Sequence, residues 1–457
     1  MNIKLALILA VCFTSFSTSF MSSSINVAVA AISGDYGIKP DYITYAISAY
    51  VISATAFLIP SSALANYIGY HKAFSLGAIS TAVCALLVAF APDFYLFVGL
   101  RALQGACNAL LFSTGTALIS DNIDKEHRGS AIGINVAAVY AGLTFSPVLG
   151  GILTDSLGWQ SMFFITAALN VISYSIGRKV PYDTPNSSNY PHLKMLFCVS
   201  GFICVLIALS QMAQSYLYSV LLLLGVVLLV VYLGMEKKSD NPLINFSMLI
   251  KNRILGWALG ASFFNYMATF AVALLLSMYL QLVMGYSAMH TGLILLIQPA
   301  LQCLFSPYAG KLSQTVSSHL IVLAGMSLST VSMVIFIFLN KEMALSTIIL
   351  GQSMCGIGFG LFSAPNTTIV MNSVDRSKFA LVSALQAVTR NAGMSLCMAM
   401  LTFIFAVYIV AAKGSDLYLT ELSVSISYSF ILSVGLGIAG LICCLLGYKA
   451  ALAAGDH

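Results

Sequence analysis

The amino-acid sequence predicts an all-α integral membrane protein with fourteen membrane-spanning helices. Of its 457 residues, 59% are hydrophobic and 8% are charged, whereas soluble proteins carry about 25% charged residues. The mean hydropathy of +0.94 excludes a soluble protein, because a water-soluble domain of this size needs a polar surface. The apolar runs are long and continuous rather than alternating ten-residue segments, which favours helices over a β-barrel.

Fourteen apolar stretches each approach or exceed the roughly 20 residues that a helix needs to cross a bilayer. They lie at residues 5–31, 42–64, 73–91, 94–118, 130–153, 160–177, 195–212, 216–235, 254–283, 291–312, 320–339, 343–368, 380–411 and 425–448. The first begins like a signal peptide, with Lys4 before an apolar run. The run continues to Ile32, which is too long for such a peptide, so we expect a retained span.

The placement of Lys and Arg supports this number of spans. With the N-terminus inside the cell, the inner segments hold fifteen of the twenty basic residues and the outer loops hold only Lys39, Lys341 and Lys413. The remaining two, Arg101 and Arg390, lie within spans. Because cytoplasmic loops are enriched in Lys and Arg, we expect a multi-pass protein of the plasma membrane with both termini cytoplasmic.

Spans 1–6 and 9–14 resemble two copies of one unit. An offset of 251 residues brings Gly105 onto Gly356, Asp124 onto Asp375 and Arg101 onto Gln352. The sequence therefore predicts two six-helix pseudo-repeats with an inserted helix pair. The predicted divisions are an N-terminal half at 1–178, the inserted pair with its cytoplasmic loops at 179–253, and a C-terminal half at 254–457. Such halves around a central site are typical of rocking transporters.

One arginine lies inside the fourth span. A charge near the bilayer centre costs roughly 2.5–3.5 kcal/mol on insertion scales, so such a residue usually faces a water-filled cavity or a partner. We therefore expect Arg101 to line a transport pathway. The alternative is that Arg101 only ties helices together through backbone carbonyl groups.

Other polar side chains within the spans could complete the pathway, or could join helices by hydrogen bonds of about 0.6 kcal/mol on average. The substrate-pathway candidates besides Arg101 are Asn26, Gln104, Asn108, Asn135, Gln298, Gln352 and Arg390. None of the fifteen acidic residues lies in the middle of a predicted span. An arginine keeps its proton, so proton coupling would depend on Asp41, at the start of the second span, or on Asp155, after the fifth.

Several classes of function are not supported by any motif. There is no HExxH, Gly-x-Ser-x-Gly or P-loop sequence, so we expect neither an enzyme nor a primary pump. The ten cysteines show no metal-ligand spacing, and we expect neither a metal nor a cofactor. The net charge of +5 follows the membrane topology and does not indicate nucleic acid. The expected partners are a small-molecule substrate and the lipid bilayer, with the chain acting as a monomer.

Five stretches carry a family resemblance. They are Pro60–Lys72, Leu100–Gly105 (LRALQG), Ala141–Gly151 (AGLTFSPVLGG), Gly158–Phe164 (GWQSMFF) and Thr389–Gly393 (TRNAG). They resemble the major facilitator superfamily, specifically its fourteen-span drug:proton antiporter branch. In order, they are similar to its gating loop, its fourth-helix motif with an arginine linked to proton coupling, its antiporter motif, the start of helix six, and a recurrent stretch of helix thirteen.

The antiporter motif would form a hinge or sliding seam. Small residues at Gly142, Ser146, Gly150 and Gly151 allow close helix approach, and Pro147 permits a bend. Ser146 stands where the family usually has Gly.

The gating loop, with Asn66, Gly69 and Lys72, departs from the family pattern. Asn66 replaces the usual Asp, and Tyr70 and His71 replace basic residues. In the first helix, Met21 stands where the branch usually carries an Asp.

The resemblance implies a secondary active transporter that exports small amphiphilic compounds or drugs by alternating access, with proton coupling as an option. A site with Arg101 and no acid favours neutral or anionic compounds over the lipophilic cations usual for the branch. Two alternatives remain open. One is a facilitative or ion-independent transporter of a neutral or anionic metabolite, and the other is a transporter-like sensor that does not transport.

Overall fold

The computed structural model describes residues 3–123, 125–178, 190–211, 215–237, 252–313, 315–339, 343–374, 379–411 and 415–454. These residues form helices and short connections, without a strand. Asp124 and Asp375, which the repeat aligns, lie outside the described residues, as do parts of the predicted loops of the inserted pair. Thirteen helices within the described ranges are long and apolar enough to cross a membrane. The remaining predicted span, 160–177, is present as an 18-residue helix that includes the polar residues Gln160 and Asn170.

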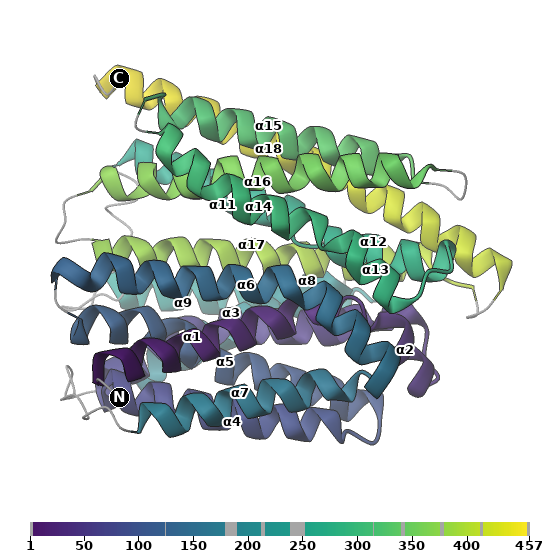
Figure 1. Ribbon diagram of the computed structural model, residues 1–457, viewed down its shortest axis with the longest axis horizontal. Helices are drawn as coiled ribbons and strands as arrows, with labels where there is room; N and C mark the ends of the chain where they lie inside the picture. The colour runs from purple at the N-terminus through teal and green to yellow at the C-terminus, as the bar shows by residue number, and fades with distance from the viewer. Residues whose placement is uncertain are drawn as a thin grey trace. The chain divides into compact units, whose positions relative to one another are not determined.

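The chain forms two compact units, Met1–Ser239 with Tyr286–Leu293, and Asp240–Gly285 with Ile294–His457. The helices before residue 240 are α1 (Ile3–Ser24), α2 (Val29–Asp35), η1 (Pro40–Tyr42), α3 (Ile43–Ile68), α4 (Tyr70–Ala89), α5 (Phe94–Asn122), α6 (Lys125–Leu157), α7 (Gln160–Gly177), α8 (His192–Gln211) and α9 (Leu217–Lys237) (Figure 1). The predicted first span is thus interrupted, because turns at 25–28 separate α1 from α2.

The later helices are α11 (Arg253–Thr269), α12 (Val272–Met278), η2 (Tyr279–Val283), α13 (Ala288–Leu295), α14 (Ile297–Leu312), α15 (Ser318–Ile337), α16 (Leu345–Asn372), α17 (Phe379–Tyr408) and α18 (Asp416–Ala454). Most of α13 is grouped with the first unit, although the repeat places this segment in the C-terminal half. The predicted division at 178 and 253 stays a prediction.

The two units repeat one packing scheme. In the first unit α1 packs on α6 and α7, α3 packs on α5, and α4 packs on α5 and α7. In the second unit α11 packs on α17 and α18, α14 packs on α16, and α15 packs on α16 and α18. Figure 1 shows α4 and α7 side by side in the first unit. The predicted pair of six-helix pseudo-repeats is confirmed by this correspondence, and α8 and α9 form the additional pair.

Equivalent glycines sit at equivalent helix crossings. A Cβ added to Gly142 in α6 would lie 2.6 Å from the Phe16 carbonyl oxygen in α1. A Cβ on Gly393 in α17, again 251 residues later, would lie 2.6 Å from the Phe263 carbonyl oxygen in α11. Both glycines allow backbone-to-backbone packing, which in a bilayer must supply much of the attraction between helices. The repeat is therefore visible in the close contacts as well as in the helix order.

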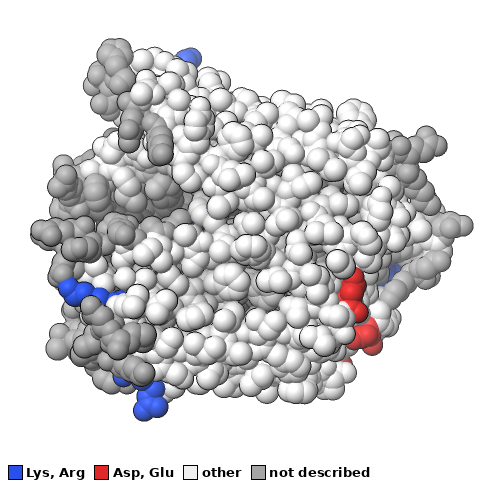
Figure 2. All heavy atoms as spheres, viewed as in Figure 1, with Lys and Arg blue, Asp and Glu red and all other residues white. Residues whose placement is uncertain are grey.

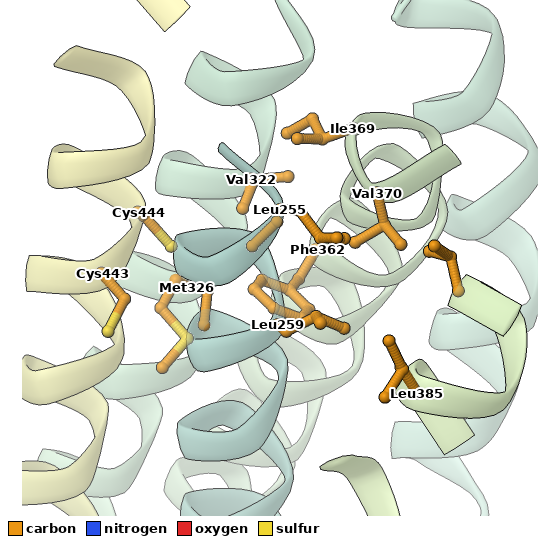
Figure 3. Packing of buried hydrophobic residues seen from close by; sticks show 13 residues of the cluster. Leu255, Leu259, Val322, Met326, Phe362, Ile369, Val370, Leu385, Cys443 and Cys444 are labelled. Carbon is orange, nitrogen blue, oxygen red and sulfur yellow. The ribbon is translucent and has the colours of Figure 1, made fainter. Parts of the chain in front are cut away.

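The core of the second unit is apolar and joins five helices. It contains Leu255 and Leu259 of α11, Val322 and Met326 of α15, Phe362, Ile369 and Val370 of α16, Leu385 of α17, and Cys443 and Cys444 of α18 (Figure 3). The two cysteines are buried there as small apolar side chains.

The outer surface is apolar as well. Figure 2 shows one face on which most atoms belong to neither acidic nor basic side chains. Helix α9 is the least enclosed of the thirteen candidate spans, and 11% of its most apolar window is buried. Such a surface suits contact with hydrocarbon, and in water it would be an aggregation site.

Candidate substrate-pathway site

Arg101 is the eighth of the 29 residues of α5 and is only 1% exposed. Its Nη1 donates a hydrogen bond of 2.6 Å to Oε1 of Gln104, one turn further along the helix. The guanidinium carbon stands 4.4 Å from the ring centroid of Tyr50 in α3 and 6.0 Å from that of Phe163 in α7. A desolvated cation–π contact contributes about 2 kcal/mol. Aromatic faces and one amide oxygen thus stabilise the buried charge.

Asn108 continues this polar cluster by two further hydrogen bonds. Its Nδ2 donates to the Tyr50 hydroxyl at 2.9 Å, and its Oδ1 accepts from the Thr81 hydroxyl at 3.0 Å. The cluster therefore links α3, α4 and α5. Gly105 lies between Gln104 and Asn108, and a Cβ there would collide with the Tyr50 carbonyl oxygen and lie 3.0 Å from the Ala54 nitrogen. The absent side chain at Gly105 is what lets α3 and α5 approach so closely.

Two hydrogen-bond donors of the cluster are unpaired within the described residues. Nε of Arg101 and Nε2 of Gln104 are buried and have no hydrogen-bond partner among the described residues. Within the same ranges, no carboxylate forms an ion pair with Arg101. A buried unpaired donor costs free energy unless an acceptor reaches it. The site is therefore electropositive and suited to an oxygen acceptor.

The expectation that Arg101 faces an open pathway differs from this arrangement. In this structure the guanidinium is enclosed by Tyr50, Phe163 and Gln104. The aromatic rings stabilise part of the charge that water would otherwise solvate in an open cavity. One cluster on α5 contains three of the predicted pathway residues, Arg101, Gln104 and Asn108. Their role in a transport pathway stays a prediction.

The other predicted pathway residues occupy separate places. Asn26 follows α1 and Asn135 lies in α6, both buried. In the second unit, Gln298 is the second residue of α14 and is half-buried. Gln352 is fully buried in α16, and neither of its side-chain polar atoms is hydrogen-bonded to a described residue. Arg390 of α17 is half-buried, with its guanidinium carbon 5.9 Å from the Tyr266 ring centroid.

The antiporter-like stretch packs its small residues against α1. Gly142 meets Phe16, and a Cβ on Gly150 would lie 2.9 Å from Cβ of Ser24. Between them, the Ser24 hydroxyl donates to the Ser146 carbonyl oxygen at 3.2 Å. The four-residue spacing places these contacts on one face of α6. Pro147 lies inside α6, which remains a single helix there.

A second face of α6 contacts the start of α13. A Cβ on Gly151 would lie 2.6 Å from the Ala288 carbonyl oxygen, and one on Gly292 would collide with the Pro147 carbonyl. Near the end of α6, Asp155 Oδ2 accepts a hydrogen bond of 2.9 Å from the backbone nitrogen of Met289. Asp155 thus caps the first turn of α13. The other proton-coupling candidate, Asp41, is 6% exposed in η1.

Replacing Asp155 by alanine should lower the apparent melting temperature in detergent. One capping hydrogen bond of α13 is lost, while the bond from His290 N to the Ser287 hydroxyl remains, and a side-chain cap contributes about 0.5–2 kcal/mol. Asp155→Asn keeps an oxygen acceptor and should lose less. A scanning fluorimetry series of the wild type and both variants checks this. Melting curves in which Asp155→Ala matches the wild type would show that the cap is energetically unimportant.

The gating-loop stretch is held by hydrogen bonds of Tyr70 and His71. Gly69 adopts a φ of +93° between α3 and α4, a conformation that glycine reaches without strain. The Tyr70 hydroxyl donates to Oδ1 of Asn66 at 2.8 Å, and Nε2 of the buried His71 lies 2.7 Å from the Gly177 carbonyl oxygen at the end of α7. Lys72 is exposed. These contacts involve Asn66, Tyr70 and His71, the positions at which the stretch departs from the family pattern.

One polar contact was not predicted from the sequence. Trp159 follows Gly158, whose φ is +83°, and its indole nitrogen donates to Oδ2 of Asp35 at 2.7 Å. The Tyr36 ring lies tilted against the indole with ring centroids 5.9 Å apart, and its hydroxyl donates to the Ala91 carbonyl oxygen at 3.0 Å. Burial, followed by the nearby charges of Asp35 and Asp93, raises the pKa of Tyr36 to about 12, so it remains a neutral donor. The sequence stretch that contains Trp159 was recognised as a motif. No feature of the sequence around Asp35 indicated that this residue would be its hydrogen-bond partner.

A family profile described as Major Facilitator Superfamily matches residues 11–398. The chain belongs to the major facilitator superfamily. Among curated members, the riboflavin transporter RibZ of Clostridioides difficile is 26% identical over 414 residues, covering 89% of this chain and 89% of that protein. The multidrug resistance protein Stp of Mycobacterium tuberculosis is 23% identical, covering 85% and 73%. The lincomycin resistance protein LmrB of Listeria monocytogenes is 22% identical, covering 94% of each chain.

Solved structures of other transporters show the same fold. A POT family transporter in complex with 5-aminolevulinic acid matches with a TM-score of 0.71 and 15% identity, covering 98% of this chain and 96% of that one. The predicted resemblance to the superfamily is confirmed, and multidrug resistance proteins are among the relatives. The protein is a multi-pass membrane transporter by family, and the members it matches are transporters rather than enzymes.

Proposed function

We propose that this superfamily member exports small amphiphilic compounds or drugs across the plasma membrane by alternating access. The multidrug resistance relatives support the substrate class. The antiporter-like stretch on α6, packed against α1 and α13, supports the direction. The protein would act as a monomer in the lipid bilayer with both termini in the cytoplasm, as the basic residues of the inner loops favour.

The observation that carries the substrate preference is the polar cluster of α5. Arg101 and Gln104 present two buried donors without partners, and no described carboxylate neutralises the charge. A lipophilic cation entering such a site would meet a fixed positive charge in a low dielectric. A neutral or anionic compound with a carbonyl or carboxylate oxygen would instead satisfy both donors. We therefore favour acceptor-bearing amphiphiles over cations.

A second candidate is transport of a riboflavin-like metabolite. RibZ, which is named as a riboflavin transporter, matches over 89% of both chains. Riboflavin is neutral, and its planar ring system carries carbonyl oxygens that can accept hydrogen bonds from the same donor-rich cluster. This candidate needs no proton antiport, and its flux would follow the substrate's own gradient.

Two further properties can be measured, namely whether transport is coupled to protons and whether the protein binds a compound without transporting it. Asp155 and Asp41 are the coupling candidates, because a titratable group has to exchange its proton as access alternates. A transporter-like sensor would bind a compound without moving it.

The test is flux in proteoliposomes with the pH gradient and the voltage clamped separately. The probes are riboflavin as a neutral acceptor, carboxyfluorescein as an anion and ethidium as a cation. We expect riboflavin or carboxyfluorescein to move faster than ethidium. Ethidium as the fastest probe would contradict the preference for acceptors, and binding without flux would contradict transport. A rate that ignores the pH gradient would remove the antiporter mechanism and leave export or facilitated transport.

A further inference from the structure

Two cysteines face each other between α4 and α5. The Sγ atoms of Cys84 and Cys107 lie 3.7 Å apart. Cys84 is buried and Cys107 is half-buried. A disulfide holds its sulfurs about 2.05 Å apart, so side-chain rotation and a small helix adjustment would bring the two sulfurs into bonding distance.

The thiol pair borders the lipid-facing side of the first unit. Val83 and Leu87 of α4 and Leu103 of α5 are each nearly half exposed, at 49%, 48% and 49%. These exposed apolar side chains lie within about one helical turn of the pair in sequence. A compound dissolved in the hydrocarbon can therefore approach Cys107, whereas a water-soluble oxidant such as glutathione disulfide would have to enter the bilayer.

The pair also adjoins the polar cluster. Cys107 precedes Asn108 in sequence, and Cys84 follows Thr81 by one turn of α4. The Thr81–Asn108 hydrogen bond joins the same two helices at 3.0 Å, and Asn108 holds Tyr50, on whose ring Arg101 rests. A covalent bond between the two sulfurs would fix α4 against α5 at the point where the cluster is anchored.

The geometry points to a membrane-embedded redox site formed by Cys84 and Cys107, which a lipid-soluble quinone oxidises to a disulfide that slows transport. In this reaction the two thiols lose two electrons and two protons, one S–S bond forms, and the quinone is reduced to the hydroquinone. A dithiol reductant reverses the step. Transport slows because closing the sulfurs from 3.7 Å to bonding distance displaces Asn108, which holds Tyr50 against Arg101.

The first test concerns the chemistry and does not depend on the proposed function. Purified protein in nanodiscs is treated with decylubiquinone, the remaining thiols are blocked with N-ethylmaleimide, and peptides are mapped by mass spectrometry. We expect a crosslinked peptide containing Cys84 and Cys107 that dithiothreitol removes. The control variant C443S/C444S should give the same crosslink. Alkylation of both thiols after quinone treatment would overturn the proposal.

The second test rests on the proposed transport function and uses the fastest probe of the flux panel. Quinone should lower wild-type flux by about fivefold or more, within the usual range of coupling between sites, and dithiothreitol should restore it. C84S and C107S should retain their flux under quinone. A crosslink that leaves flux unchanged would overturn the regulatory role, whereas absence of flux before oxidation would speak against the proposed function alone.

Discussion

Arg101→Ala is expected to lower the flux of an acceptor-bearing substrate by roughly 10- to 100-fold, because a hydrogen bond to a charged group contributes about 1.5–3 kcal/mol. The substitution removes the guanidinium that rests on Tyr50 and donates to Gln104. Initial rates in proteoliposomes, normalised to the folded protein that gel filtration recovers, measure the effect.

Two further variants separate the substrate role of Arg101 from a purely structural one. Arg101→Lys keeps the charge but loses the planar stacking and the several fixed donors, so we expect an intermediate rate. Tyr50→Phe keeps the ring face and loses only the hydrogen bond from Asn108, so its rate should be closest to the wild type. If Arg101→Ala transports normally, or loses rate only in proportion to misfolded protein, Arg101 is a structural tie between helices.

Gly105→Ala is expected to destabilise the first unit by about 1–3 kcal/mol, as overpacking does when a backbone cannot yield. The added methyl group would collide with the Tyr50 carbonyl oxygen and push α3 away from α5. The same shift would pull Tyr50 from Arg101. The apparent melting temperature in detergent measures the loss.

Gly99→Ala is the matched control in the same helix. A Cβ at Gly99 has no heavy atom within 4 Å, and alanine favours helix over glycine by about 1 kcal/mol, so this variant should be as stable as the wild type or more so. In the second unit, Gly356→Ala should behave like Gly105→Ala because its Cβ would meet the Gln298 carbonyl oxygen. Equal melting temperatures for Gly99→Ala and Gly105→Ala would contradict the close-crossing interpretation.

Hydropathy and charge placement were enough to predict the helical fold, because the bilayer imposes length and polarity directly on each span. The interruption after Ser24 and the break between α11 and α12 were not predicted, since short turns among apolar residues hardly change hydropathy. The 251-residue offset identified Gly105 and Gly356, and their equivalent crossings followed from it.

The candidate site was predictable only in part. Gln104 and Asn108 were predicted together with Arg101 because they are polar side chains within the same predicted span. The stacking of Tyr50 on Arg101 and the enclosure by Phe163 depend on how α3 and α7 pack, which periodicity does not encode. The sequence predicts that Arg101 faces a water-filled cavity or a partner, and in this structure the faces of Tyr50 and Phe163 lie against it.

The preference for acceptors is tested most directly by comparing riboflavin and ethidium uptake in the same proteoliposomes, for the wild type and Arg101→Ala, without a pH gradient or membrane potential. Riboflavin should enter faster than ethidium in the wild type. In the variant the riboflavin rate should fall by about tenfold or more, while the ethidium rate stays constant or rises because the repelling charge is gone. A wild type that prefers ethidium, or a variant in which both rates fall by the same factor, would contradict a fixed positive substrate site at Arg101.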